Sequence, residues 1–511
     1  IALSLAYVIE NKMTRGELGA RDAIRGSLEN FSPENVAEIT GVPAEELEKL
    51  GAALANKKGK SLIVAGGAAS ATDNGVSLEA AVNLLNALLG NDGATIERGR
   101  PSKQSSGDFS QLQQLVEDID AGKIDVLIID KANPVYSAPP ALGITEALEK
   151  VPFIVATGDR VDETAIYADY LATGTDPLES WGDSNPFEGV YSIQQPVILP
   201  MYDTRSFEES LLVWFGNSSI VEDFKPFLQD PEEPAGNLPG DHYVWDPGAW
   251  YRYLRNHWRE ELFSKADTVA SFEAFWKDVL RNGSWVVPSS QNPEPRINVT
   301  ETLSVLPKAL PEATSSKPGD LSQKELHTYP TVALYDGRQA NNGHLQELPD
   351  PVTKHVWGTY VQVSPRTFNE AGLELGDYVE IEVEVADGDT RTLEFPVLMQ
   401  PGMHDDVVAV PLGYGRTRCG VVGDDVGVTA FEFSRVTESR QILSGHTAKL
   451  TPTGKNEPLS VVQGAQVIDL HERDNMATTT LEEFEEDPEA GIHKHPAHEA
   501  LWEQHDYDVK W

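Results

Sequence analysis

The stretch LYDGRQANNGHLQELPDP, residues Leu334–Pro351, carries more information than any other part of this chain of 511 residues. It joins an expected strand to a glycine turn, two adjacent asparagines and a second glycine before an acid–proline exit. Gly337 and Gly343 adopt positive φ at little cost, and Asn341 and Asn342 tolerate left-handed geometry and hydrogen-bond exposed backbone. Two interpretations follow: an ordered loop whose asparagines satisfy their own backbone, or a loop that faces a ligand or a partner.

The sequence after this loop changes to an alternating pattern. Asp377–Val385 (DYVEIEVEV) alternates apolar and acidic residues, and Thr392–Met399 continues in a similar style. A period of two residues is typical of strands with one face in the core and one face in water. We therefore expect an antiparallel β domain over residues 331–470, closed as a small barrel.

Upstream of the loop, short apolar runs alternate with helical patterns. Leu78–Leu89 and Ile144–Lys150 have helical spacing, and the three expected strands are Ser61–Gly67 (SLIVAGG), Asp125–Asp130 (DVLIID) and Phe153–Gly158 (FIVATG). Fully apolar strands joined through helices indicate a parallel sheet covered on both faces, here within residues 61–215. Ligands of such sheets lie at the carboxyl ends of the strands, which are Gly66–Ala69, Asn133–Tyr136 and Thr157–Asp159.

The remaining segments have simpler patterns. Residues 1–60 are expected to be the helical part of an incomplete α/β domain, and residues 216–330 a helical insertion that ends in a Pro/Ser/Thr-rich linker, Pro288–Pro330. Leu178–Pro200 has little periodicity and much turn chemistry, so its Trp181 is expected to be a buried loop anchor, with a stacking surface as the alternative. Residues 471–511 are predicted to form an acidic arm that contains histidines.

The charge balance excludes several partners. Forty Lys plus Arg against 81 Asp plus Glu give a formal net charge of -41, which disfavours nucleic acid and anionic lipid headgroups. No segment reaches the roughly 18 uninterrupted apolar residues of a membrane helix. Because the chain starts with Ile1 and no leader pattern precedes it, we expect an internal piece of a longer protein.

Few residues point to metal or covalent chemistry. The lone Cys419 can form neither an internal disulfide nor a cysteine-held iron–sulfur cluster, and no histidine at a fixed spacing activates it as a nucleophile. GGAASATDNG after the first expected strand does not match a dinucleotide fingerprint. Four histidines near the end could hold zinc or copper, but Pro496 interrupts them and no second ligand pair is visible, so we expect no metal site: His493, His495, His498 and His505.

Five motifs, separated but in a constant order, resemble one protein family. They are NPVYSAPPAL (Asn133–Leu142), LESWGD (Leu178–Asp183), SIQQPVILPMYDTRS (Ser192–Ser206), YDGRQANNGHLQELPDPVTK (Tyr335–Lys354) and PLGYGRTRCGVVGDDVG (Pro411–Gly427). With Phe31–Leu50 and Leu84–Gly93, they resemble the molybdopterin oxidoreductase superfamily. Within it, they resemble the molybdopterin-oxidoreductase-like portion of alternative complex III, a bacterial quinol-oxidising respiratory complex. The resemblance covers nearly the whole chain and is weakest between about residues 208 and 330.

The resemblance implies an α/β fold: a parallel-sheet domain of molybdopterin-oxidoreductase type plus a C-terminal β-barrel domain. It implies an adjoining ferredoxin-like portion with iron–sulfur clusters after His505–Trp511, together with haem c subunits and a quinol-binding membrane subunit as partners. The location implied is the periplasmic face of the bacterial cytoplasmic membrane. The branch resembled is regarded as having lost the pterin-held metal, so no cofactor is expected in this chain, and Asn341, Asn342 and Arg338 would be remnants of a pterin pocket.

Three functional hypotheses follow. The first is a non-catalytic scaffold that docks and shields the iron–sulfur portion. The second is the C-terminal part of an active molybdopterin oxidoreductase of polysulfide or thiosulfate reductase type, in which Arg338, Arg416 and Arg418 would contact phosphates of the cofactor. The third is an acidic module that recruits a basic electron carrier, with association rates that fall as salt rises. No catalytic residue and no metal ligand is assigned in this chain.

Overall fold

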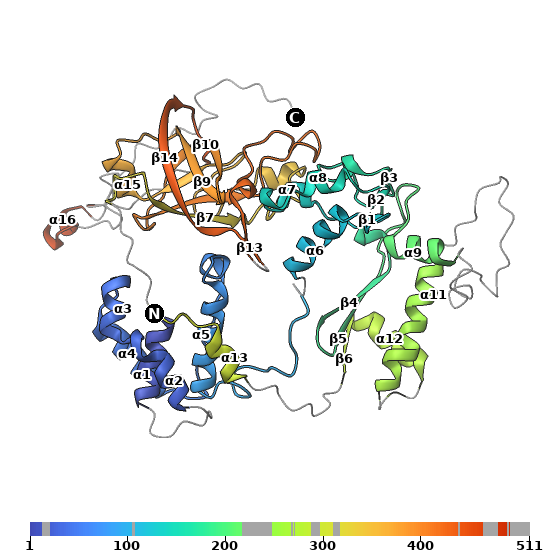
Figure 1. Ribbon diagram of the computed structural model, residues 1–511, viewed down its shortest axis with the longest axis horizontal. Helices are drawn as coiled ribbons and strands as arrows, with labels where there is room; N and C mark the ends of the chain where they lie inside the picture. The colour runs from blue at the N-terminus through green and yellow to red at the C-terminus, as the bar shows by residue number, and fades with distance from the viewer. Residues whose placement is uncertain are drawn as a thin grey trace.

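The structure is a computed structural model of the chain. It describes residues 1–12, 21–104, 108–216, 248–287 without 267, 268 and 270, 297–309, 317–437, 440–462, 479–487 and 490. In these residues the elements form four groups: N-terminal helices, a parallel sheet, a small antiparallel sheet with helices, and a barrel (Figure 1).

The N-terminal group is helical, as predicted. Its core contains leucine and isoleucine side chains, including Ile9, Leu28, Leu84 and Leu85. The helices are α1 (Ala2–Lys12), α2 (Arg21–Leu28), α3 (Pro33–Thr40), α4 (Ala44–Ala55), α5 (Gly75–Leu88) and the later α13 (Val299–Ser304). The predicted helix over Leu78–Leu89 is thus confirmed as most of α5.

The predicted strand Ser61–Gly67 is wrong. The segment is extended but pairs with no described strand, and a 3-10 turn, Gly67–Ala71, follows it. Asn86 of α5 satisfies its central peptide, because its side chain accepts from the Ile63 N–H at 3.1 Å and donates to the Ile63 carbonyl at 2.8 Å. Leu62 and Val64 stay exposed. An apolar run forms a strand only where a neighbouring strand has unpaired backbone groups with which it can hydrogen-bond.

The other two predicted strands form the parallel sheet. Strands β1 (Leu127–Ile129), β2 (Ile154–Ala156) and β3 (Tyr170–Leu171) pair in that order and are all parallel. One face packs against α6 (Phe109–Asp120) and α8 (Ile144–Leu148). The opposite face, with Ile128 and Tyr170, is exposed in the described part of the chain, so the prediction of two covered faces is wrong there.

The C-terminal group is a closed barrel with the strand order β10-β8-β11-β7-β14-β9. The strands are β7 (Lys324–Pro330), β8 (Val361–Val363), β9 (Asp377–Ala386), β10 (Asp389–Met399), β11 (Val407–Leu412) and β14 (Ser444–Asn456). The barrel and its alternating strands β9 and β10 are confirmed, but the pairing is mixed, since β10 with β8 and β11 with β7 are parallel. Strand β7 lies inside the predicted linker, which is therefore shorter than expected.

The fourth group contains most of the tryptophans. Its antiparallel sheet consists of β4 (Gly182–Phe187), β5 (Val190–Gln194) and β6 (Ser284–Val286), and its helices are α9 (Phe207–Gly216), α11 (Gly248–His257) and α12 (Phe272–Asn282). Trp258, Phe275 and Trp276 form the core of this group. The prediction of an irregular segment over Leu178–Pro200 missed the hairpin β4–β5.

Short elements complete the structure. They are α7 (Pro134–Ser137), α14 (Gly343–Gln346), α15 (Pro365–Glu370), β12 (Arg435–Thr437), β13 (Arg440–Ile442) and α16 (Leu481–Glu486). The four histidines of the predicted acidic arm lie outside the described residues. Among the described helices, none has the length and apolar character needed to cross a bilayer.

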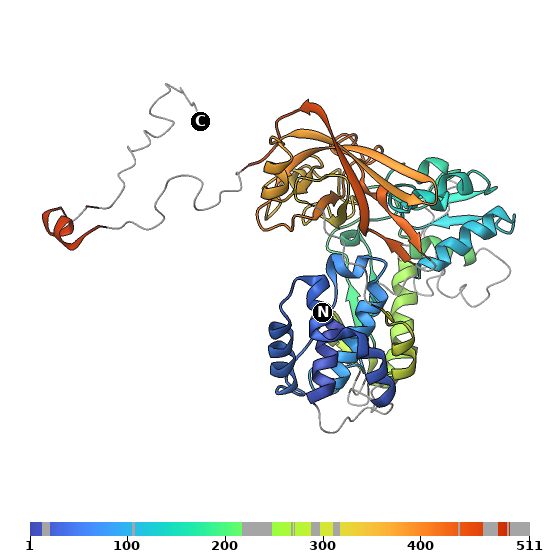
Figure 2. The ribbon, with the colours of Figure 1, turned by 60° about the vertical axis from the view of Figure 1, so that its left-hand side comes forward.

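The barrel contacts two of the other groups. Figures 1 and 2 both place it next to the parallel sheet, with the N-terminal helices below the barrel. The N-terminal group contacts the barrel domain through a hydrogen bond and an ion pair. The Leu443 N–H donates to the Ala71 carbonyl at 3.2 Å, and Arg435 pairs with Asp73 at 2.7 Å. The contact between sheet and barrel contains a buried ion pair and is the candidate site.

Candidate functional site between the sheet and the barrel

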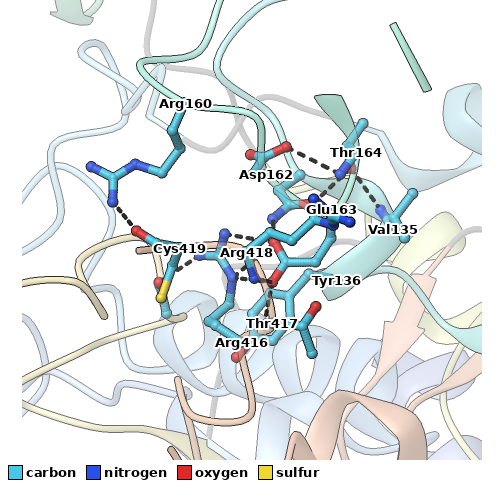
Figure 3. A network of polar contacts seen from close by, with 12 residues as sticks. Val135, Tyr136, Arg160, Asp162, Glu163, Thr164, Arg416, Thr417, Arg418 and Cys419 are labelled. Atoms are coloured by element: carbon cyan, nitrogen blue, oxygen red, sulfur yellow. Dashed lines mark hydrogen bonds and ion pairs between the residues drawn. The ribbon is translucent and has the colours of Figure 1, made fainter. Parts of the chain in front are cut away.

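The carboxyl ends of β1 and β2 come together, as predicted. Asn133, after β1, donates from its amide to the Glu163 carboxylate at 2.8 Å and accepts from the Thr164 hydroxyl at 2.6 Å. The Thr164 hydroxyl also accepts from the Val135 N–H at 3.1 Å. These contacts bring Glu163 to the edge of the sheet that faces the barrel (Figure 3).

The centre of this site is a buried ion pair between the sheet and the barrel. Arg416 donates to both oxygens of Glu163, with its Nη2 at 2.7 Å and its Nε at 3.0 and 3.1 Å. The two side chains are only 6% and 10% exposed. The remaining Arg416 nitrogen, Nη1, donates to the Gly337 carbonyl at 2.7 Å, and the guanidinium lies 4.8 Å from the Tyr136 ring centroid. We call Asn133, Tyr136, Glu163, Gly337 and Arg416 the junction.

Glu163 is strongly held in its charged form. Burial alone would raise its pKa, but hydrogen bonds from Arg416, from the Thr417 N–H at 2.8 Å and from Asn133 outweigh burial and hold the pKa at about 2. The Arg418 N–H adds a further bond at 3.1 Å. Burial likewise disfavours the Arg416 cation, and Glu163 compensates, so the pKa of Arg416 is raised. A buried pair with so many hydrogen bonds is costly to break from one side.

Tyr136 and Gly337 make the close approach possible. The Tyr136 hydroxyl donates to the Tyr414 carbonyl at 2.7 Å, and burial raises the pKa of this phenol. Gly337 has φ +89, and a Cβ there would lie 2.8 Å from the Tyr136 hydroxyl oxygen. Only glycine therefore fits this position. The expected strand at Leu334 is absent, since Leu334 is buried within consecutive turns.

Cys419 is buried and has the surroundings of a structural cysteine. It is 2% exposed, and burial raises the pKa of its thiol to about 11. Its carbonyl accepts from Arg160, which lies beyond β2, and its N–H donates to Asp424 at 2.6 Å. A reactive cysteine needs a lowered pKa and access to solvent. In the described residues, no group of three or more His, Cys, Asp or Glu side chains is placed to hold a metal ion.

Asn341 and Asn342, the two asparagines of the loop, both accept hydrogen bonds from backbone N–H groups of this chain. Asn342 caps α14, because its side-chain oxygen accepts from the N–H groups of His344 and Leu345 at 3.1 and 3.3 Å. The Asn341 oxygen accepts from the Val422 N–H at 3.0 Å. Gly420 packs so closely against Asn341 that a Cβ at Gly420 would lie 2.5 Å from the amide nitrogen. The loop thus joins two segments of the barrel domain.

The candidate phosphate contacts are mostly matched by carboxylates. Arg338 binds Asp336 through Nη2 at 2.6 Å and through Nε at 2.9 Å, and Arg416 binds Glu163. Arg418 is exposed on the surface. A pterin cofactor with phosphates needs amide or cationic donors that are unspent. In the described part of the chain, Arg338 and Arg416 are therefore already engaged by carboxylates and are poorly suited to such a polyanion.

One predicted strand end does not join this site. Gly66–Ala69 lies toward β13, where the neighbouring Ser70 carbonyl accepts from Arg440 at 2.6 Å. Glu163 was missed by the sequence reasoning, although it connects Asn133 of the sheet to Arg416 of the barrel. Its partner Arg416 lies 253 residues later, and no local spacing connects the two.

Comparisons with known proteins place this geometry in context. No protein-family model matches the chain. The menaquinone reductase, molybdopterin-binding-like subunit, of Nitratidesulfovibrio vulgaris is 31% identical over 443 residues, which cover 81% of this chain and 55% of that protein. The thiosulfate reductase molybdopterin-containing subunit PhsA of Salmonella typhimurium is 24% identical over 305 residues, 57% of this chain and 38% of that protein. The chain thus spans about half, or less, of the length of these relatives.

A solved structure shows the same fold. Acetylene hydratase from Pelobacter acetylenicus superposes with a TM-score of 0.59 over 88% of this chain and 69% of that chain, at 14% identity. The fold, an α/β part with a parallel sheet plus a six-stranded barrel, is therefore that of the molybdopterin enzymes. Together with the two relatives, it supports the molybdopterin oxidoreductase superfamily.

Proposed function

We propose that the chain is a non-catalytic scaffold of a quinol-oxidising respiratory complex of the alternative complex III type, and that it docks the iron–sulfur electron-transfer portion. The junction carries the proposal. Arg416 and Glu163 occupy the edge of the parallel sheet where relatives of this fold class bind ligands, and they satisfy each other. The name of the first relative, a molybdopterin-binding-like subunit of a menaquinone reductase, agrees with a respiratory role.

The function of the junction in this proposal is mechanical. Glu163 is held from the sheet side by Asn133 and from the barrel side by Arg416 and two backbone N–H groups. Such a pair fixes the angle between the two domains, because rotation would strand a buried charge. A fixed angle would hold iron–sulfur clusters at constant separation from their electron donor and acceptor.

Partners and location belong to the same proposal. The expected partners are a ferredoxin-like iron–sulfur portion, haem c subunits and a quinol-binding membrane subunit, at the periplasmic face of the cytoplasmic membrane. Similarity to a subunit of menaquinone reductase supports a membrane-associated assembly. The acidic surface, with a formal charge of -41, favours contacts with basic protein surfaces.

Elemental analysis of the native complex tests the absence of a pterin-held metal. Molybdenum and tungsten should each stay below about a tenth of an atom per copy of this chain, while iron is abundant from the partner clusters and haems. Near-stoichiometric molybdenum or tungsten would refute the scaffold. Growth in medium supplemented with molybdate and tungstate removes metal limitation as a reason for a low value.

A second candidate is the C-terminal part of an active molybdopterin oxidoreductase of the polysulfide or thiosulfate reductase type. Similarity to the molybdopterin-containing subunit PhsA favours it. In this case Arg416 would have to leave Glu163 to contact a cofactor phosphate, and Glu163 would need another partner for its buried charge. Stoichiometric metal together with thiosulfate or polysulfide reduction by the native complex would establish this alternative.

A further inference from the structure

A second site shares no residue with the junction and lies between the loop that follows β3 and the first turns of α9 and α11. It is an open cavity of about 360 Å³. Its walls come from Thr175–Trp181, from the loop Pro196–Pro200 and from the helical residues Ser206, Glu209 and Trp250. This volume is at the lower end of ligand sites, and it suits one long side chain or a small organic group. We call it the tryptophan cavity.

The lining of the tryptophan cavity favours a cation. Trp181 and Trp250 form its aromatic wall, and Val197, Ile198 and Leu199 its apolar wall. Among the described lining residues, the charged ones are two carboxylates, Glu179 and Glu209, and none is a lysine or an arginine. An anion would thus meet like charges. A cation with an apolar stem would meet aromatic rings and carboxylates.

Both tryptophan rings are held in place before any ligand binds. The Trp250 indole N–H donates to the Trp181 carbonyl at 2.8 Å. Trp250 stacks on Tyr253 with ring centroids 5.6 Å apart, and Trp181 packs on Tyr251 at 4.7 Å. Fixed aromatic rings bind a cation without a further loss of side-chain freedom.

Glu179 and Thr175 supply acceptors that the chain leaves available. The Glu179 carboxylate accepts one N–H on each oxygen, from Met201 at 3.0 Å and from Asp176 at 3.1 Å. A carboxylate has about four acceptor positions, so capacity remains. In the part of the chain that the structure describes, no lysine or arginine pairs with Glu179, and the Thr175 hydroxyl has no hydrogen-bond partner although Thr175 is 93% buried (7% exposed).

The rim of the cavity is suited to contact with a protein. The loop beyond it exposes a continuous set of apolar side chains, Val197, Ile198, Leu199, Met201 and Tyr202. Contiguous exposed apolar side chains mark protein interaction surfaces. The formal charge of -41 would also steer a basic protein toward this chain.

We propose that the tryptophan cavity binds a lysine or arginine side chain of a partner protein, whose neighbouring apolar residues rest on the loop Val197–Tyr202. The cationic head would lie between the rings of Trp181 and Trp250 and donate to Glu179 and Thr175. The identity of the partner as a subunit of the same complex rests on the proposed scaffold function. The binding chemistry does not, and it is tested separately from metal content.

The first experiment titrates the native complex or the complete protein with the capped tripeptide acetyl-Leu-Lys-Leu-amide and follows tryptophan fluorescence. The control peptide has norleucine in place of lysine, which keeps the apolar stem and removes the charge. The lysine peptide should saturate with a dissociation constant on the order of 1–10 mM, and the norleucine peptide should bind at least about tenfold more weakly. Equal binding of the two peptides would overturn the proposal.

Variants locate the effect. Glu179→Gln removes the charge and keeps one acceptor oxygen, so it retains one of the two backbone contacts. It should weaken the lysine peptide about tenfold, while Thr175→Val should weaken it about threefold. The matched control is Glu208→Gln, an exposed carboxylate in the first turn of α9 that is not part of the lining, and it should leave binding unchanged. If Thr175→Val folds and both cavity variants bind like the native protein, the cation is not held here. That result would leave the metal analysis, and hence the scaffold, untouched.

Discussion

The junction and the tryptophan cavity each combine a carboxylate with an aromatic ring, and they differ in how their charges are matched. At the junction, Glu163 and Arg416 face each other, and every candidate donor has a partner within the chain. In the tryptophan cavity, considering only the residues that the structure describes, the Thr175 hydroxyl is buried without a partner and no basic residue belongs to the lining. Where buried charged and polar groups find their partners within the chain, the contact is a structural one between domains. Where such groups lack partners, we expect another molecule to bind.

The largest effect is expected from breaking the junction on one side. Arg416→Met leaves the Glu163 charge buried without its main partner and should lower the free energy of unfolding by about 3–5 kcal/mol. The double variant Arg416→Met with Glu163→Met should recover most of this loss, since no charge is left unpaired. Urea unfolding curves of the three proteins measure the difference. A single variant as stable as the native protein would mean that the junction is loose and solvated.

Lowering the pH is a second way to test the ion pair at the junction. The pKa of Glu163 is about 2 in the folded protein and about 4.5 when unfolded, so its charge stabilises the fold above pH 4.5. This contribution, about 3 kcal/mol, should be lost progressively as the pH falls from about 5 to 2. In Glu163→Gln, the stability should change less over this range. A parallel pH profile of the two proteins would show that Glu163 is not held by Arg416 in solution.

His446 gives a different pH window. This side chain of β14 is 2% exposed, and burial lowers its pKa to about 4. Its neighbours Arg435, Asp73 and His327 come from β12, the N-terminal group and β7. Because the unfolded histidine binds a proton first, stability should fall by up to about 3 kcal/mol between pH 6.5 and 4.

His446→Phe should remove that part of the slope and leave the loss below pH 4.5 unchanged. Thermal unfolding between pH 7 and 4 measures it. An unchanged slope in His446→Phe would place the titrating group elsewhere, with His355, which also has a pKa of about 4, as the next position to replace.

The smallest effect is expected in the tryptophan cavity. Thr175→Val replaces a buried hydroxyl that lacks a partner by a methyl group of similar size, so the protein should become more stable by about 1 kcal/mol. Thr164→Val is the matched comparison, because the Thr164 hydroxyl has two partners at the junction and its loss should destabilise. Destabilisation by Thr175→Val would show that the hydroxyl is satisfied in solution, and it would remove the contrast between the two sites.

The parts of the fold that were predictable are those with local repetition. β9 alternates, β10 alternates in its first half, and β1 and β2 are compact apolar runs, so these patterns identify the strands. β7 was hidden because the surrounding Pro, Ser and Thr residues are typical of a linker. The segment Ser61–Gly67 has the composition of a strand, but its pairing depends on tertiary context that composition does not contain.

The site was predictable only in part for the same reason. The carboxyl ends of parallel strands meet by geometry, so Asn133 and the residues after β2 were expected to be neighbours. The conformational freedom of Gly337 was also visible in the sequence. Glu163 and its pairing with Arg416 were not, because an ion pair between domains has no spacing rule. The exact use of Asn341 and Asn342 likewise depended on which backbone N–H groups the fold brought near them.

A density map of the native complex at the edge of the parallel sheet tests the central claim most directly. If the chain is a non-catalytic scaffold, we expect continuous density between the Arg416 guanidinium and the Glu163 carboxylate, with Tyr136 packed against them and no pterin between sheet and barrel. Density for a pterin there, with Arg416 turned from Glu163 toward a phosphate, would contradict it.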